Sequence, residues 1–167
     1  MAYDKNQKLA IRSLEETKKK FHALIKALSQ DDLIIPSKFT KRTVRGVLTH
    51  LLISMEKSYP MLVKKAKKSK AMPSFFGTKL GHYFSYKYSE YVGKNKSLEL
   101  MLIEYDIAHQ SLIAEVIKIF EEEWSLKTSL PKPNDRVLSM LKIFTYQIPN
   151  HFDVHGKEIM ETINGTK

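Results

Sequence analysis

Apolar residues recur at intervals of three and four along four long stretches of this 167-residue chain. That spacing lines up one face of an α-helix, whereas a half-exposed strand would need strict alternation. The clearest stripe lies near the C-terminus and comprises Val137, Leu141, Phe144, Ile148, His151, His155, Ile159 and Ile163. Because each stripe must be buried against other helices, the pattern predicts one all-α domain over residues 1–167, a four-helix bundle.

The first two helices have clear limits in the sequence. The first is predicted from about Asp4 to Ser29, and the second begins after an N-cap at Thr43 and runs, with a kink at Pro60, to about Lys68. The connection between them is short, so we expect antiparallel neighbours. The bundle is then of the up-down type, with one long crossover connection over residues 71–96.

The other two helices are capped by Ser97 and by Asn134 or Asp135. The inward stripe of the third helix is predicted to be Ile103, Ile107, Gln110, Ile113, Ile117 and Phe120. Seven of the seventeen aromatic residues fall between Phe75 and Tyr91, in the crossover. We expect this aromatic segment to carry a short helix and to cap one end of the bundle rather than wall a pocket. Left exposed, it would form a self-complementary patch for a homodimer.

The absence of cysteine excludes disulfides, thiolate zinc sites and cysteine nucleophiles. Any metal must be held by His, Asp or Glu, and any thiol chemistry needs an external thiol. No apolar run approaches the roughly 20 residues of a membrane span, and the first residues lack the apolar core of a signal peptide. We therefore expect a cytoplasmic protein without a membrane partner.

The formal net charge of +10 raises the question of a nucleic-acid partner. Lysine heavily outnumbers arginine, the residue better suited to phosphate and base recognition. The densest run, from Lys64 to Lys70, lies where a helix should end, and there cations complement the helix dipole. We favour a solvated lysine-rich surface over nucleic-acid binding.

Two histidines replace apolar residues in the stripe of the fourth helix. His151 and His155 are four residues apart, so both rings project from one side and can bind one ion. Alternatively, both are merely hydrogen-bonded residues of the core or its boundary. His50, at the edge of the inward face of the second helix, would supply a third imidazole and leave one tetrahedral corner open for water or substrate.

The segments RTVRGVLTHLL and HFDVHGKEI resemble the capped second helix and the closing H-x-x-x-H of the DinB/YfiT-like superfamily, which includes bacillithiol transferases and mycothiol-dependent maleylpyruvate isomerase. The resemblance implies a four-helix bundle with His50, His151 and His155 as ligands of a divalent metal, zinc or nickel. It also implies transfer of a low-molecular-weight thiol. This sequence departs from the family in two places that bear on the geometry of the site. Many members carry a tryptophan just before the second helix, whereas the nearest aromatic residue here is Phe39. In addition, Pro149 interrupts the fourth helix.

The leading hypothesis is a metal-dependent enzyme acting on a small-molecule substrate, either transferring a low-molecular-weight thiol or hydrolysing the substrate. The alternative is a non-enzymatic stress-related or small-molecule-binding protein without metal. The remaining polar candidates carry less weight: Asp153 points away from His151 by helical geometry, Glu158 is more readily a solvated residue than a support for a ligand, and His22, His82 and His109 are secondary.

Overall fold

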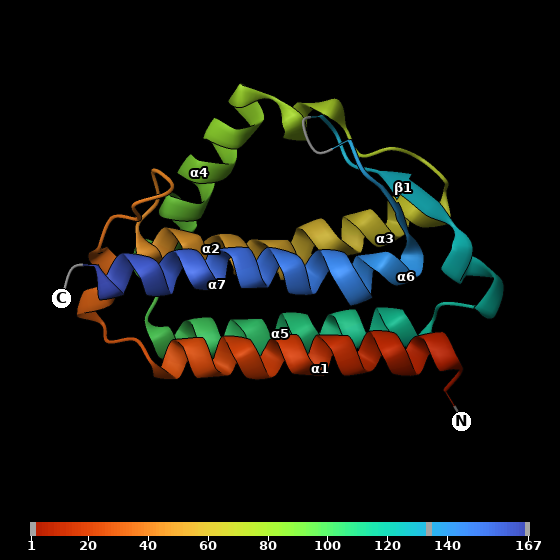
Figure 1. Cartoon of the computed structure of the whole chain (residues 1–167), viewed down its shortest axis with the longest axis horizontal. Coiled ribbons are helices and arrows are strands. Elements are labelled where there is room, and N and C mark those ends of the chain that lie inside the picture. Colours follow the sequence, from red (N-terminus) through yellow and green to blue (C-terminus); the bar gives the residue numbers. More distant parts are fainter. Residues whose placement is uncertain (1–2, 133–134, 166–167) are drawn as a thin grey trace.

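Four helical rods form the bundle in the computed structural model, which describes residues 3–132 and 135–165 (Figure 1). The first rod is α1 (Lys5–Lys26) and the third is α5 (Leu98–Ile117). The second joins α2 (Val44–Ile53) to α3 (Tyr59–Lys67) through the π-helical turn Ser54–Ser58, and the fourth joins α6 (Met140–Lys142) to α7 (Ile148–Asn164) through the π-helical turn Ile143–Gln147. The predicted all-α bundle is confirmed. None of the helices in these ranges has both the length and the apolar character that crossing a membrane requires.

The helix starts show which local signals were sufficient. The side chain of Thr43 accepts a hydrogen bond from the backbone N–H of Gly46, and Ser97 accepts one from Leu100, as predicted. The start of the fourth rod was predicted too early: Ser139 is its N-cap, while Asn134 lies outside the described residues.

A small hairpin accounts for that late start. Strand β2 (Val137–Ser139) pairs antiparallel with β1 (Lys127–Ser129), with Thr128 opposite Leu138. The backbone of the expected first helical turn therefore forms a ladder instead. In this hairpin Leu138 is buried and Val137, the predicted start of the inward stripe, is 61% exposed.

The order of the rods around the bundle also differs from the prediction. Both α1 and α2 pack against α5 and α7, so α1 and α2 lie diagonally and are not neighbours. The connection between them is long enough to cross the end of the bundle, with a 3₁₀ turn at Asp31–Ile34 (η1) and a bridge between Pro36 and Thr43. Figure 1 shows α2 and α5 running in the same direction, which requires the long crossover between α3 and α5.

The inward face of α5 is opposite to the predicted one. Its buried residues are Met101, Tyr105, Ala108, His109, Leu112 and Val116, whereas Ile103 and Ile107 are 50% and 59% exposed. The apolar residues of α5 are distributed around its whole circumference, so their spacing alone does not select the buried face. An exposed isoleucine stripe results.

The crossover carries a longer helix than expected. After the 3₁₀ turn Ser74–Gly77 (η3) comes α4 (Lys79–Gly93), which packs on α2 at one end and stands away from the bundle at the other (Figure 1). Glu90 of α4 accepts a hydrogen bond from the backbone N–H of Thr43 at 2.7 Å. A Cβ atom at Gly46 would lie 1.9 Å from the Glu90 carboxylate, so any larger residue at this position would displace the Glu90 side chain.

Candidate metal centre

The structure brings His50, His151 and His155 together between α2 and α7. The Nε2 atoms of His50 and His151 are 3.2 Å apart, and the three ring centroids are separated by 4.8 to 5.1 Å. One ring nitrogen from each histidine lies within 4.8 Å of the others. The sequence thus identified a real cluster, and that the cluster binds a metal stays a prediction.

The chemistry of the donors and the spacing of one pair fit a divalent ion. Two ligands of one tetrahedral zinc-like ion are about 3.4 Å apart, close to the separation of the His50 and His151 Nε2 atoms. Neutral imidazole is a donor that zinc and nickel both accept. Three imidazoles leave a coordination position for another ligand, which is typical of catalytic rather than structural zinc sites.

Glu158 orients the His155 ring. Its Oε2 atom lies 2.7 Å from His155 Nδ1, and its Oε1 atom accepts hydrogen bonds from the hydroxyls of Ser37 at 2.5 Å and Thr40 at 2.8 Å. Although burial favours the neutral acid, these three hydrogen bonds outweigh it and lower the pKa of Glu158. An ionised Glu158 holds the proton of His155 on Nδ1 and leaves Nε2 free to bind an ion. The residue expected to be solvated is only 6% exposed and supports the site.

Tyr59 plays the corresponding part for His151. Its buried hydroxyl lies 2.6 Å from His151 Nδ1. Burial raises the pKa of Tyr59, so its hydroxyl remains protonated. Accepting the Nδ1–H bond of His151, it would leave Nε2 of that ring facing His50. The sequence analysis missed this residue.

The two π-helical turns place these groups. The turn Ser54–Ser58 ends directly before Tyr59 and Pro60, and the turn Ile143–Gln147 ends directly before Ile148 and Pro149. Proline has no N–H to continue the α-helical ladder, so a turn with one extra residue is tolerated there. In the sequence, a proline inside an otherwise helical stretch is the signal for each π-helical turn, which ends two residues before it. The interruption expected at Pro149 is therefore a π-helical turn in the rod that carries two candidate ligands.

Burial and neighbouring charges keep His50 and His151 neutral. Burial, and then the charges of His151, Arg42 and other neighbours, hold the pKa of His50 well below its usual value. Burial, then His155 and Arg42, lower the pKa of His151 to about 3. Neutral imidazoles are the form that binds metal, so both rings are ready to act as ligands at neutral pH.

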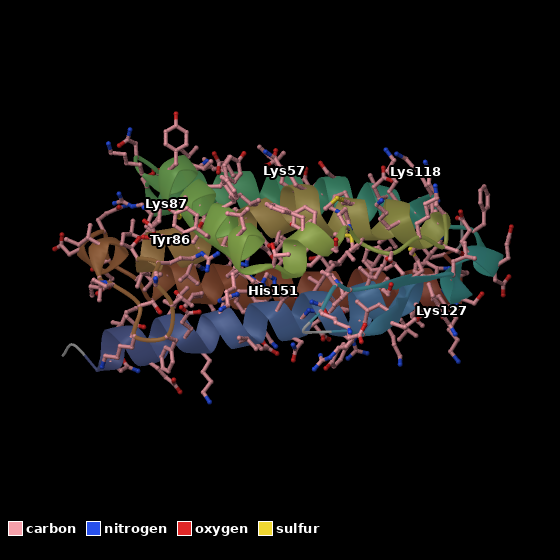
Figure 2. The ribbon with its side chains drawn as sticks, turned by 90° about the horizontal axis from the view of Figure 1, so that it is seen from above. Lys57, Tyr86, Lys87, Lys118, Lys127 and His151 are labelled. Atoms are coloured by element: carbon pink, nitrogen blue, oxygen red, sulfur yellow. The ribbon has the colours of Figure 1, made fainter. Side chains whose placement is uncertain are left out.

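A pocket of about 710 Å³ opens onto the histidines, lined by all three rings and by residues of α2, the turn Ser54–Ser58, η3 and α4. Its outer wall contains Phe75, Phe76, Phe84 and Tyr88. The aromatic segment therefore walls a pocket, which corrects the expectation that it caps the bundle. In the view from above, α4 lies over α2, and the end of α4 that follows η3 approaches the part of α7 that carries His151 (Figure 2).

The secondary candidates are distributed as follows. His82 lines the same pocket from α4. His22 pairs with Asp106 at 2.7 Å, and His109 is buried beside Tyr105, 3.6 Å from Glu15 and away from the site. Asp153 contacts Lys20 at 2.6 Å and not the histidines, as its helical position predicted.

Comparison with known proteins identifies the fold. YfiT from Bacillus subtilis, described as a probable metal-dependent hydrolase with an unusual four-helix bundle topology, superposes with a TM-score of 0.71 at 17% identity, over 99% of this chain and 90% of YfiT. An uncharacterized protein from Clostridium difficile 630 gives a TM-score of 0.66 at 14% identity over 96% of both chains. No protein-family model and no curated protein matches the sequence. At these identities the similarity shows a YfiT-like fold.

Proposed function

We propose that this chain, with its DinB/YfiT-like fold, is a metal-dependent enzyme that presents a low-molecular-weight thiol to a small-molecule substrate. The observation that supports the proposal is the convergence of three imidazoles at the base of an aromatic-walled pocket. A divalent ion held there, zinc or nickel, would supply Lewis acidity, which deprotonates a bound thiol outright but lowers the pKa of water only to about 7.

The composition of the pocket favours a thiol over water. None of the described residues that line it is an aspartate or glutamate. Hydrolysis benefits from a general base near the attacking water, and Glu158 is already occupied by three hydrogen bonds. A thiol needs no such base, and it must come from outside because the chain has no cysteine.

The protein's own residues would bind and orient. Glu158 and Tyr59 fix the proton positions of His155 and His151, so that both rings offer Nε2. The aromatic wall excludes water from one side of the pocket and contacts the apolar part of a substrate. The sequence contains no nucleic-acid recognition motif that would give the basic surface such a partner. We propose that the enzyme acts in the cytoplasm.

Metal content and thiol conjugation test the proposal together. Protein purified without a histidine tag should contain close to one divalent ion per chain, and His151→Ala should lose it while keeping its helical circular dichroism. His109→Ala, which changes a buried histidine outside the site, is the matched control. The zinc- or nickel-loaded protein should then accelerate conjugation of monochlorobimane with a small thiol, and His151→Ala should not. Ester hydrolysis without thiol conjugation would favour the hydrolase alternative.

One observation favours a second candidate, a stress-related or small-molecule-binding protein without metal. The His50 and His151 Nε2 atoms are within hydrogen-bond distance, so one ring can satisfy the other without an ion. A protein that binds no divalent ion after incubation with zinc or nickel, yet still binds aromatic compounds in the pocket, would support this alternative over the enzyme.

A further inference from the structure

An arginine in the pocket wall is held by neutral partners. Arg42 is half-buried and lines the pocket beside the histidines. Its Nε atom donates to Ser89 Oγ at 3.1 Å and its Nη2 atom to Ser85 Oγ at 3.2 Å, both on α4. A guanidinium has five N–H donors, so these two contacts leave donors for a ligand.

The two carboxylates whose charges act on the Arg42 guanidinium already accept hydrogen bonds from other residues. These carboxylates are Glu158 and Glu90. Glu158 accepts hydrogen bonds from His155, Ser37 and Thr40, while Glu90 accepts them from the backbone N–H and hydroxyl of Thr43. Within the described ranges, no carboxylate forms an ion pair with Arg42. Its positive charge is therefore available to the pocket.

The rest of the described lining adds a cation and an aromatic surface. The cation is Lys57, whose Nζ donates to Tyr88 Oη at 3.0 Å. Four aromatic side chains complete the wall, and the described lining contains no acidic residue. Partial burial strengthens an interaction between a guanidinium and an oxyanion, and the planar fork suits a carboxylate bidentately.

We propose that Arg42 is the anion-binding residue of this pocket, and that its ligand is a small aromatic or apolar molecule bearing a carboxylate or similar oxyanion. The oxyanion would bind Arg42 while the apolar part contacts the aromatic wall and the reactive carbon faces the three histidines. That the ligand is a substrate rests on the proposed function, whereas the anion selectivity does not.

A simpler role for Arg42 would be to attach α4 to α2, and the chain offers a control for it. Arg45 also links α2 to α4, because its Nη1 atom donates to the carbonyl of Lys94 at 2.5 Å. Arg45 does not line the pocket. The variant Arg45→Gln therefore weakens the same attachment and removes the same charge from the chain without changing the pocket.

The experiment is calorimetric titration of chelator-treated protein with 2-naphthoate and with its neutral isostere 2-naphthamide. The wild type should bind naphthoate at least about tenfold more tightly than naphthamide, a ratio expected of one charge-assisted contact. Arg42→Gln should reduce the ratio to about one while retaining naphthamide binding, and Arg42→Lys should give an intermediate ratio. Arg45→Gln should leave the ratio unchanged.

Equal affinities in the wild type, or an unchanged ratio in Arg42→Gln, would overturn the inference. Should Arg42→Gln not fold, the wild-type ratio and Arg42→Lys still decide, because a Lys variant with the full wild-type ratio also contradicts a role for the guanidinium fork. Repeating the titration with zinc-loaded protein separates the two proposals. A preference that appears only with zinc and persists in Arg42→Gln means that the ion binds the carboxylate: the inference fails and the metal site stands. A preference that follows Arg42 in a protein that binds no metal keeps the inference and removes the proposed function.

Discussion

At the scale of single residues, Glu158 connects parts of the site that are far apart in the sequence. Its two oxygens contact His155 on its own helix and Ser37 and Thr40 in the connection before α2. Burying an unpaired carboxylate would cost several kcal/mol, and here three donors compensate. The same carboxylate thus sets the tautomer of a candidate ligand and holds the chain that leads into the helix of another.

Replacement of Glu158 should therefore weaken metal binding more than folding. In Glu158→Gln the amide oxygen can still accept the hydrogen bonds of Ser37 and Thr40, but the acceptor and the negative charge that face His155 are lost. We expect metal affinity to fall by about 10- to 100-fold, the usual effect of losing such a partner, as measured by competition with a chromophoric chelator. The control is Glu161→Gln on the same helix, whose carboxylate lies 3.6 Å from Lys157 Nζ. Equal affinities of the two variants would show that Glu158 has no influence on the site.

The low pKa of His151 predicts how the metal-free protein responds to acid. Burial lowers the pKa of His151 to about 3 in the folded state, whereas in an unfolded chain it is about 6.5. Below pH 6.5 the unfolded chain therefore binds a proton that the folded chain does not, and His50 acts in the same direction. This contribution to stability is fully present above pH 6.5 and falls by about 1.4 kcal/mol per pH unit as the pH approaches 3.

Urea unfolding of chelator-treated protein between pH 7.5 and pH 5 measures this slope. His151→Gln should give a shallower decrease in the free energy of unfolding, because one of the buried histidines with a lowered pKa is gone. The matched control is His82→Gln, which replaces an exposed histidine of the same pocket. Parallel pH profiles for wild type and His151→Gln would contradict the assignment of His151 as a buried neutral ring.

At the scale of elements, α4 is the part that turns a bundle surface into a pocket, and it depends on its attachment to the start of α2. Glu90 accepts hydrogen bonds from the backbone N–H and the hydroxyl of Thr43. Thr43 lies at the N-terminus of α2, where the helix dipole also favours a negative charge. The aromatic wall belongs largely to α4 and its preceding turn. The geometry of the pocket should therefore be sensitive to residues that never touch a ligand.

Glu90→Ala should loosen α4 selectively. The substitution removes two hydrogen bonds and the capping charge, which together contribute about 1–2 kcal/mol. Hydrogen exchange of α4 amides should accelerate, while amides in the buried turns of α1 remain protected. Lys87→Ala, on the same helix and without a partner in α2, should leave the exchange of α4 as in the wild type. Uniform acceleration over all helices would indicate global destabilisation instead.

The elements also show which information the sequence contained. The inward face of α1 was predictable because polar residues cover the rest of that helix, and Ala10, Leu14 and Phe21 are fully buried. The inward face of α5 was not predictable, because one face carries Met101 and Tyr105 and the opposite face carries isoleucines. Only packing against the neighbouring rods decides which of these two faces is buried. The histidine pair followed from its spacing. The partners Tyr59 and Glu158 required tertiary structure, since one precedes a helix-breaking proline and the other resembles a solvated charge.

At the scale of the whole molecule, two apolar surfaces remain exposed on a chain with a net charge of +10. One is the outward face of α4, where Leu80, Tyr83 and Tyr91 are 56%, 52% and 79% exposed. The other is the isoleucine face of α5. The predicted homodimer therefore has two candidate interfaces. One end of α4 stands out from the bundle in Figure 1, and the aromatic face of this helix remains our choice.

Sedimentation equilibrium tests this choice, with salt as a diagnostic variable. Two copies with a charge of +10 repel each other, so screening by salt should strengthen a dimer held by apolar contacts. Lys87, labelled with Tyr86 in Figure 2, lies beside Tyr83 at 5.8 Å from its ring and adds a local positive charge to this face. We expect a dimer whose dissociation constant decreases between 50 and 500 mM NaCl.

Tyr83→Lys should make the protein monomeric, because it places a further positive charge in the interface on each of the two copies. Ile107→Lys, on the exposed face of α5, should leave the dimer intact. A monomer at all concentrations would contradict the prediction, and dissociation by Ile107→Lys but not by Tyr83→Lys would assign the interface to α5.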